Sequence, residues 1–74
     1  MLIRYKENKA ALNNIYDVVK NERVGYSDNK YIEFIYFDGF NKLWYFETQE
    51  ERDKVYNLIM NNYFTDIEEL INDN

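Results

Sequence analysis

Three hydroxyl side chains, Ser27, Thr48 and Thr65, are the only ones in the sequence that could serve as a serine- or threonine-type nucleophile. Such a hydroxyl is weak until a neighbouring base takes its proton, and histidine is the usual base. The chain has no His and no Cys, so a Lys or a carboxylate would have to act instead. None of the three hydroxyls lies in a motif that pairs it with such a residue. We therefore predict that the chain is not an enzyme.

Carboxylates could also do acid–base chemistry, and Glu47, Glu50 and Glu51 lie close together in the sequence. That chemistry needs a cleft that moves two pKa values apart, whereas these acids lie at a helix start, where acids are common. The two glycines form no phosphate-binding loop, and the acids of 66–73 lack the pattern of a calcium loop. Without thiolates or imidazoles a zinc site is not expected either. The sequence predicts no cofactor and no metal.

The composition indicates one small domain over residues 1–74, because a chain of this length can build only one core. Eight Tyr, five Phe and one Trp supply the apolar mass, and no disulfide is possible. Arg4 and Lys6 follow the first apolar residues at once, which excludes the apolar segment of a signal peptide. No apolar run approaches the roughly 20 residues of a membrane span. We expect a cytoplasmic protein that does not enter a membrane.

The charge is distributed unevenly along the chain. Residues 47–74 hold eight acids and two bases, a net charge of −6, whereas residues 1–46 hold six acids and seven bases, a net charge of +1. Carboxylates spaced along helices can imitate phosphates and occupy the basic groove of a protein that handles nucleic acid. The alternative is a solvated acidic face that maintains solubility. The acids predicted to contact a partner are Glu50, Asp53, Asp66, Glu68 and Glu69.

A β-hairpin is predicted over residues 30–47. The runs 31–37 and 43–46 are aromatic and β-branched, and Asp38-Gly39 between them is a strong turn signal. A two-residue loop would pair Phe34 with Leu43, and a four-residue loop would pair it with Tyr45, so both loops give the same faces. One predicted face carries Ile32, Phe34, Tyr36, Leu43 and Tyr45, and the other carries Tyr31, Glu33, Ile35, Phe37, Lys42, Trp44 and Phe46.

Both predicted faces are therefore apolar, although a small sheet normally buries only one. Either an N-terminal element covers the second face, or that face binds something, since exposed aromatic patches mark interfaces. Tyr36, Trp44 and Tyr45 are the predicted aromatic contacts, and a homodimer through this face is one possibility. Single-stranded nucleic acid is the alternative ligand, because Lys20, Arg23, Lys30 and Lys42 lie near the strands. The net charge of −5 disfavours phosphate binding.

A helix is predicted over 49–63, because Thr48 and Glu51 form a capping box. Val55, Leu58 and Ile59 recur at helical spacing and are expected, with Phe46, to be buried in the core. A second capping box at Thr65 predicts a short helix over 65–71. Residues 1–26 are ambiguous. Residues 2–5 can form an edge strand. Residues 9–20 could form a helix, or they could instead lead into a strand from about Ile15 to Arg23. The turn-forming residues 27–29 favour the strand.

The stretch from Tyr31 to Ile59 resembles small proteins of phages and mobile elements, which share an aromatic hairpin closed by Asp-Gly and a helix that opens Glu-Glu-Arg. In size and acidity the chain is similar to anti-CRISPR proteins. We predict an α+β fold, with an antiparallel sheet of three or four strands and the 49–63 helix on one face. The resemblance implies a phage-type inhibitor of a host protein with a basic groove, possibly a CRISPR effector. A nucleic-acid binder or a self-associating structural subunit are the alternatives.

Overall fold

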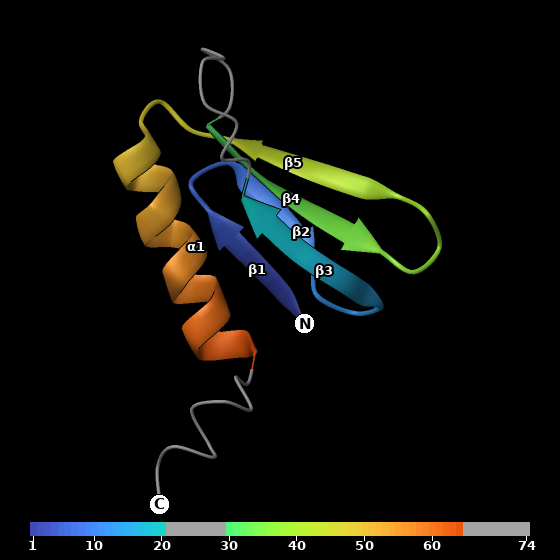
Figure 1. Ribbon diagram of the computed structural model, residues 1–74. Coiled ribbons are helices and arrows are strands. Elements are labelled where there is room, and N and C mark those ends of the chain that lie inside the picture. Colours follow the sequence, from blue (N-terminus) through green and yellow to red (C-terminus); the bar gives the residue numbers. More distant parts are fainter. Residues whose placement is uncertain (21–29, 65–74) are drawn as a thin grey trace, which may run out of the picture.

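The computed structural model describes residues 1–20 and 30–64, in which five strands precede one helix (Figure 1). β1 (Leu2–Tyr5) and β2 (Asn8–Ala11) form an antiparallel hairpin. β3 (Ile15–Lys20), β4 (Tyr31–Tyr36) and β5 (Asn41–Tyr45) form a three-stranded antiparallel sheet with β4 in the centre. α1 (Gln49–Tyr63) follows. The predicted α+β class is confirmed, and so is the antiparallel sheet with the helix on one face.

Residues 1–20 form three strands, so the ambiguity over 9–20 is resolved in favour of strands. β1 lies where an edge strand was predicted, and β3 begins at the predicted Ile15. Residues 21–23, the rest of that predicted strand, and the predicted helix at 65–71 lie outside the described residues. β2 was not predicted from the sequence, because Ala10 and Ala11 favour a helix on intrinsic propensity.

The pairing of β4 with β5 differs by one residue from the register predicted for a two-residue loop and by three residues from that predicted for a four-residue loop. The loop has three residues, since the Tyr36 amide donates to the Phe40 carbonyl at 2.9 Å and Gly39 has a φ of +91°. A positive φ after a turn is typical of three-residue hairpin loops. Trp44 therefore pairs with Ile32, and the predicted faces were wrong for every residue of β5.

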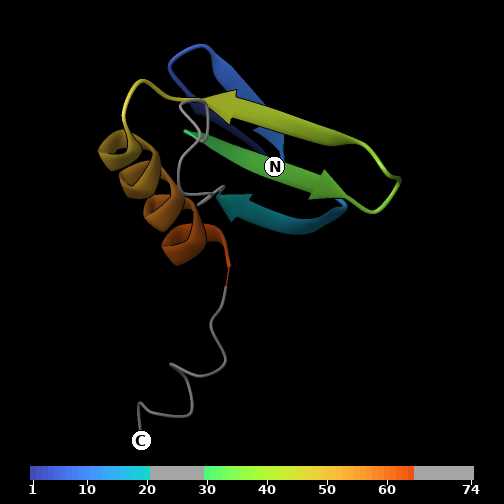
Figure 2. The same ribbon diagram turned by 45° about the horizontal axis from the view of Figure 1, so that its top comes forward.

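The corrected register gathers the largest side chains on one face of the sheet, the inner face. Trp44 joins Val18, Ile32 and Phe34 there, and the Phe34 and Trp44 ring centroids lie 4.7 Å apart. The covering layer consists of the β1–β2 hairpin and α1. The buried residues of that layer in the core are Ile3, Ala10, Val55 and Ile59. In Figure 2, α1 lies beyond the end of the sheet toward which β3 and β5 point.

The helix buries a narrower stripe than the sequence predicted. Val55 and Ile59 are buried as expected, but Leu58 is 55% exposed, so its predicted place in the core is wrong. Phe46 is half-buried. The third buried residue of α1 is Arg52, one turn before Val55, so the buried stripe lies to one side of Leu58. Within the described ranges, no helix is long and apolar enough to cross a membrane.

Candidate protein-binding surface

The outer face of the three-stranded sheet, opposite the core, is the main candidate surface. Strand alternation and register place eight residues on it: Asp17, Val19, Tyr31, Glu33, Ile35, Asn41, Leu43 and Tyr45. Both covering elements of the described fold, the β1–β2 hairpin and α1, pack on the inner face instead. None of the apolar side chains of the outer face packs against the buried core. The surface is thus an apolar sheet face without a cover among the described residues.

Pairs of aromatic rings stand at both ends of this face. Tyr31 and Tyr45 are register partners with ring centroids 5.8 Å apart, and the Tyr45 side chain is 64% exposed. At the other end, Tyr16 meets Phe37 edge-on at 5.4 Å. An irregularity in β3 between Ile15 and Asp17 lies at Tyr16.

Backbone hydrogen bonds hold the loop that carries Phe37. The Phe37 amide donates to the Asn14 carbonyl at 3.0 Å, and the Asp38 carboxylate accepts from the Phe40 amide at 3.1 Å. Phe37 and Phe40 are each 73% exposed, although the loop itself is tied to the rest of the sheet. Rigid, exposed aromatic side chains are typical anchors of protein interfaces, because little conformational entropy is lost when they bind.

The charged groups that residues 1–20 and 30–64 place on the outer face are all acidic. Glu33 lies in its centre, and its carboxylate accepts a hydrogen bond from the side-chain amide of Asn41 at 2.6 Å. Asp17, the register partner of Ile35, lies on the β3 edge. Lys20 and Lys42 are register partners of Ile32 and Phe34 and so belong to the inner face. Of the other bases of the described chain, Lys30 precedes β4 beside Phe46, and the rest lie in the β1–β2 hairpin and α1.

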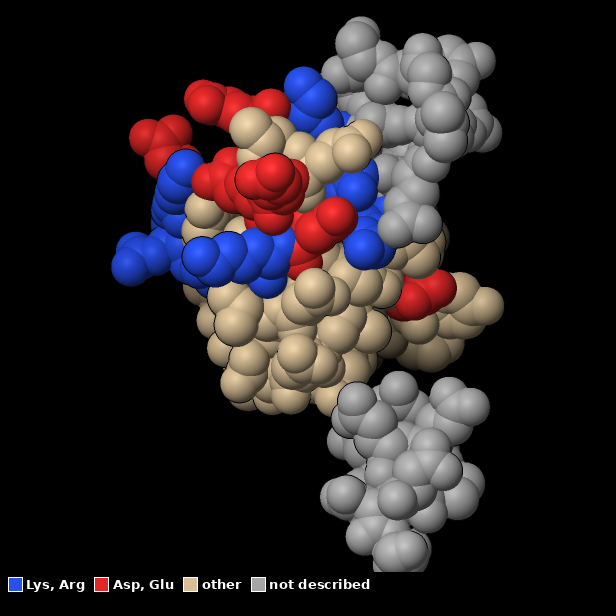
Figure 3. Space-filling model, turned by 60° about the vertical axis from the view of Figure 1, so that its left-hand side comes forward, with Lys and Arg blue, Asp and Glu red and all other residues tan. Residues whose placement is uncertain are grey.

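The acidic first turns of α1 hold Glu50 and Asp53, two of the predicted partner contacts, and beside them Glu51. Thr48 is the N-cap and accepts from the Glu51 amide at 3.1 Å, which confirms that half of the capping box. Glu51, however, is ion-paired with Lys6 at 2.8 Å and accepts from the Tyr5 hydroxyl at 2.5 Å. These donors lower the pKa of Glu51 below its ordinary range. Figure 3 shows acids and bases interleaved over this end of the molecule.

Asp53, which was predicted to contact a partner, is also paired. Its carboxylate accepts from the Arg52 guanidinium at 2.8 Å and from the Lys20 ammonium at 3.5 Å. The Arg52 hydrogen bond is the main cause of the lowered pKa of Asp53. Paired carboxylates imitate phosphates poorly, because their charge is already compensated. Glu50 alone among the predicted acids of α1 is exposed without a hydrogen bond or ion pair to another described residue.

The excess negative charge lies outside the described fold. Residues 1–20 and 30–64 contain eight acids and eight bases, so their side chains carry no net charge. Residues 21–29 and 65–74 contain six acids and one base, which accounts for the net charge of −5. The predicted contacts Asp66, Glu68 and Glu69 belong to 65–74 and lie outside the described residues.

The predicted aromatic contacts separate in the structure. Trp44 is 1% exposed, so it cannot touch a partner in this fold, and its indole donates to the Lys9 carbonyl at 3.2 Å. Tyr36 is half-buried and donates to the Ala11 carbonyl at 2.7 Å. Tyr45 alone lies on the outer face. Sequence reasoning missed Leu43 and Val19 there, and a three-residue reading of Phe37-Asp38-Gly39 would have found Leu43.

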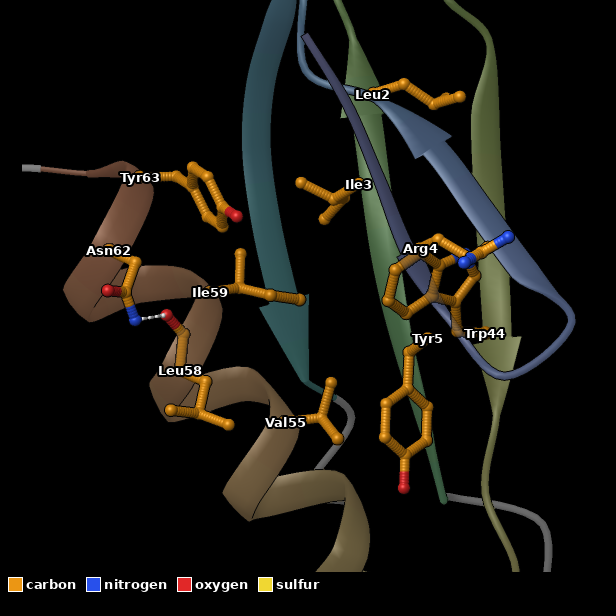
Figure 4. Close-up of a pocket in the computed structure, with 10 residues that line it drawn as sticks. All are labelled: Leu2, Ile3, Arg4, Tyr5, Trp44, Val55, Leu58, Ile59, Asn62 and Tyr63. Atoms are coloured by element: carbon orange, nitrogen blue, oxygen red, sulfur yellow. Dashed lines mark hydrogen bonds between the residues drawn. The ribbon is translucent and has the colours of Figure 1, made fainter.

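A groove between β1 and α1 is a further candidate surface, and it is lined mainly by apolar side chains. It has a volume of about 360 Å³, and Leu2, Leu58 and Tyr63 contribute partly exposed apolar side chains to it (Figure 4). Its polar members are Arg4, Tyr5, Asn62 and the Tyr63 hydroxyl, and Asn62 already donates to the Leu58 carbonyl at 2.7 Å. No pair of groups suited to nucleophilic or acid–base catalysis lines this groove.

Among the described residues, no group of three metal-ligating side chains comes together. No family model, no curated protein and no solved structure matches the chain. The functional argument therefore depends on the surfaces themselves.

Glu51→Gln is expected to lower the thermal stability slightly near neutral pH and to have little effect in acid. The pKa of Glu51 is depressed in the folded state, chiefly by the Lys6 and Tyr5 hydrogen bonds. Its stabilisation is therefore present above the unfolded-state pKa of about 4.3 and disappears as the pH falls through the folded-state value. Melting temperatures of parent and variant between about pH 7 and pH 3 measure this. A difference that did not shrink in acid would contradict the ion pair, and Glu50→Gln is the control.

Proposed function

We propose that this chain is a non-catalytic protein-binding module that contacts its partner through the outer face of the β3–β5 sheet. The observation that carries the proposal is the apolar outer face with aromatic pairs at both ends and no described element covering it. Five apolar or aromatic side chains on one sheet face give the composition of an interface core. A face of this kind would otherwise be exposed to water at a cost in solubility.

The partner class that we favour is a host protein with a basic nucleic-acid-binding surface, and the chain would act as its inhibitor. Three features support this: the small size, the acid excess in residues 65–74, and the resemblance of residues 31–59 to phage and mobile-element proteins of the anti-CRISPR type. Such an inhibitor would act in the cytoplasm of the host cell. Direct binding of nucleic acid is disfavoured, because Asp17 and Glu33 would repel phosphates from the aromatic face.

The test is capture of partners by the parent and by two charge-introducing variants. Leu43→Arg places a charge within the outer face, and Leu58→Arg places the same charge at the β1–α1 groove, where the side chain is exposed. We expect the captured protein to bind the parent and Leu58→Arg alike, and to bind Leu43→Arg at least about 30-fold more weakly, as hot-spot changes near 2 kcal/mol do.

Circular dichroism of both variants verifies that the fold is retained. Loss of the partner with Leu58→Arg and its retention with Leu43→Arg would assign binding to the groove. Recovery of nucleic acid that binds the purified chain directly would replace the proposal with the single-strand alternative.

A further inference from the structure

We propose that the outer face recognises an arginine or lysine side chain that the partner presents within an apolar patch, and that Glu33 is its counter-charge. This inference rests on the proposed function, since it specifies the chemistry of the partner at the same face.

The position of Glu33 makes it the centre of the site. It lies on β4, the middle strand, and its register partners are Leu43 on β5 and Val19 on β3. Tyr31 and Ile35 flank it along β4 on the same face. A partner that covers these apolar side chains must also cover the carboxylate between them.

Burial of that carboxylate without a cation would oppose binding. An ionised group removed from water is strongly destabilising unless it is paired and hydrogen-bonded. The Asn41 amide satisfies one oxygen, Oε2, and orients the carboxylate. No described residue donates a hydrogen bond to the other oxygen, Oε1. Oε1 is therefore available to a guanidinium or ammonium group, and the Tyr31 and Tyr45 rings on the same face favour a cation as well.

The charge distribution excludes the two other kinds of occupant. A second copy of this chain would bring another outer face, on which the described residues place Asp17 and Glu33 and no base, so the acids would be buried without a cation among them. A phosphate backbone would bring like charge to the same place. A partner surface with a basic side chain among apolar ones is complementary to this face in charge and in apolar character.

The first arm of the test uses defined probes and needs no prior partner. The peptide acetyl-Leu-Tyr-Arg-Tyr-Leu-amide and the same peptide with citrulline differ only in the charge of one side chain. We expect millimolar arginine peptide to shift the backbone amide resonances of Tyr31, Glu33 and Leu43, and the citrulline peptide to bind about 10-fold more weakly. Glu33→Gln should remove the difference between the peptides.

Shifts of equal size from both peptides, or no shifts on the outer face from either, would overturn the proposal. Glu33→Gln keeps an acceptor for the Asn41 amide, so the variant separates loss of charge from loss of that hydrogen bond. Glu7→Gln, at an exposed acid in the β1–β2 loop, is the matched control and should leave the peptide preference intact.

The second arm uses the captured partner and separates this inference from the proposed function. We expect Glu33→Gln to weaken that complex about 10-fold, as loss of a charge-assisted hydrogen bond does. If Leu43→Arg abolishes binding but Glu33→Gln does not change it, the outer face is the interface and the arginine or lysine contact is wrong. If neither variant matters, both proposals fail. Sedimentation that showed a dimer broken by Leu43→Arg would identify a second copy as the occupant and overturn both.

Discussion

Trp44→Ala is expected to destabilise the fold by about 3–5 kcal/mol, the usual loss for a buried large aromatic side chain. The indole is 1% exposed, packs against the Phe34 ring and donates to the Lys9 carbonyl, so it joins the sheet to the β1–β2 hairpin. A domain of this size has a total stability on the order of 5 kcal/mol. Most of the variant should be unfolded at room temperature, which urea titration followed by far-ultraviolet circular dichroism measures.

Tyr45→Ala is the matched control, because it changes the next residue of the same strand on the opposite face. With 64% of Tyr45 exposed, its loss should change the free energy of unfolding by less than about 1 kcal/mol. The pair tests the register directly. If Tyr45→Ala proved far more destabilising than Trp44→Ala, the register would be the one predicted from the sequence.

Ile59→Ala has the second largest expected effect, a loss of about 2–5 kcal/mol. Ile59 is 5% exposed and belongs to the core cluster, so its truncation leaves a cavity between α1 and the inner face of the sheet. Leu58→Ala removes the same number of carbons from the neighbouring residue, which is 55% exposed. It should cost less than about 1 kcal/mol.

Thermal melts of both variants, beside the parent, provide the measurement. Similar losses from the two changes would mean that Leu58 is covered in solution, by another copy or by a part of the chain beyond the described residues. The concentration dependence of the Leu58→Ala melt separates these two explanations, because only self-association responds to concentration.

The sequence predicted best what depends on neighbours in the chain. The bounds of α1 agree with the prediction, since Thr48 provides the N-cap and the first turn is acidic. The strand identity of residues 31–36 follows from β-branched and aromatic residues in a row. Each of these signals is contained within a few residues and needs no knowledge of distant contacts.

The register and the N-terminal hairpin depended on contacts that the sequence does not display. A loop of two or four residues keeps one set of faces and a loop of three residues reverses it, so one residue around Gly39 decided the position of Trp44. β2 forms because Ala10 is small enough to lie against the sheet, where it is buried. Intrinsic propensity does not include this tertiary contact.

The composition of the candidate site depends on the same loop length, because the register sets which residues of β5 lie on the outer face. The sequence indicated that one aromatic face would be spare, but it assigned Trp44 to a binding role and overlooked Leu43. Glu50 and Asp53 of α1 were expected to contact a partner, whereas Asp53 is ion-paired with Lys20 of β3, as its neighbour Glu51 is with Lys6 of the β1–β2 hairpin. Long-range ion pairs of this kind cannot be inferred from the spacing of charges along one helix.

The division of the sheet into a packed inner face and a separate outer face also determines which positions can change in evolution. Along β4 and β5, alternate residues are under different constraints. Ile32, Phe34 and Trp44 must fit a dense interior, whereas Tyr31, Glu33, Leu43 and Tyr45 lie on the opposite face and do not belong to the core cluster. Substitutions in the second set can accumulate with little loss of stability. A small scaffold of this kind can follow a changing target, because a new specificity requires new side chains on alternate positions of two strands and no repacking of the interior.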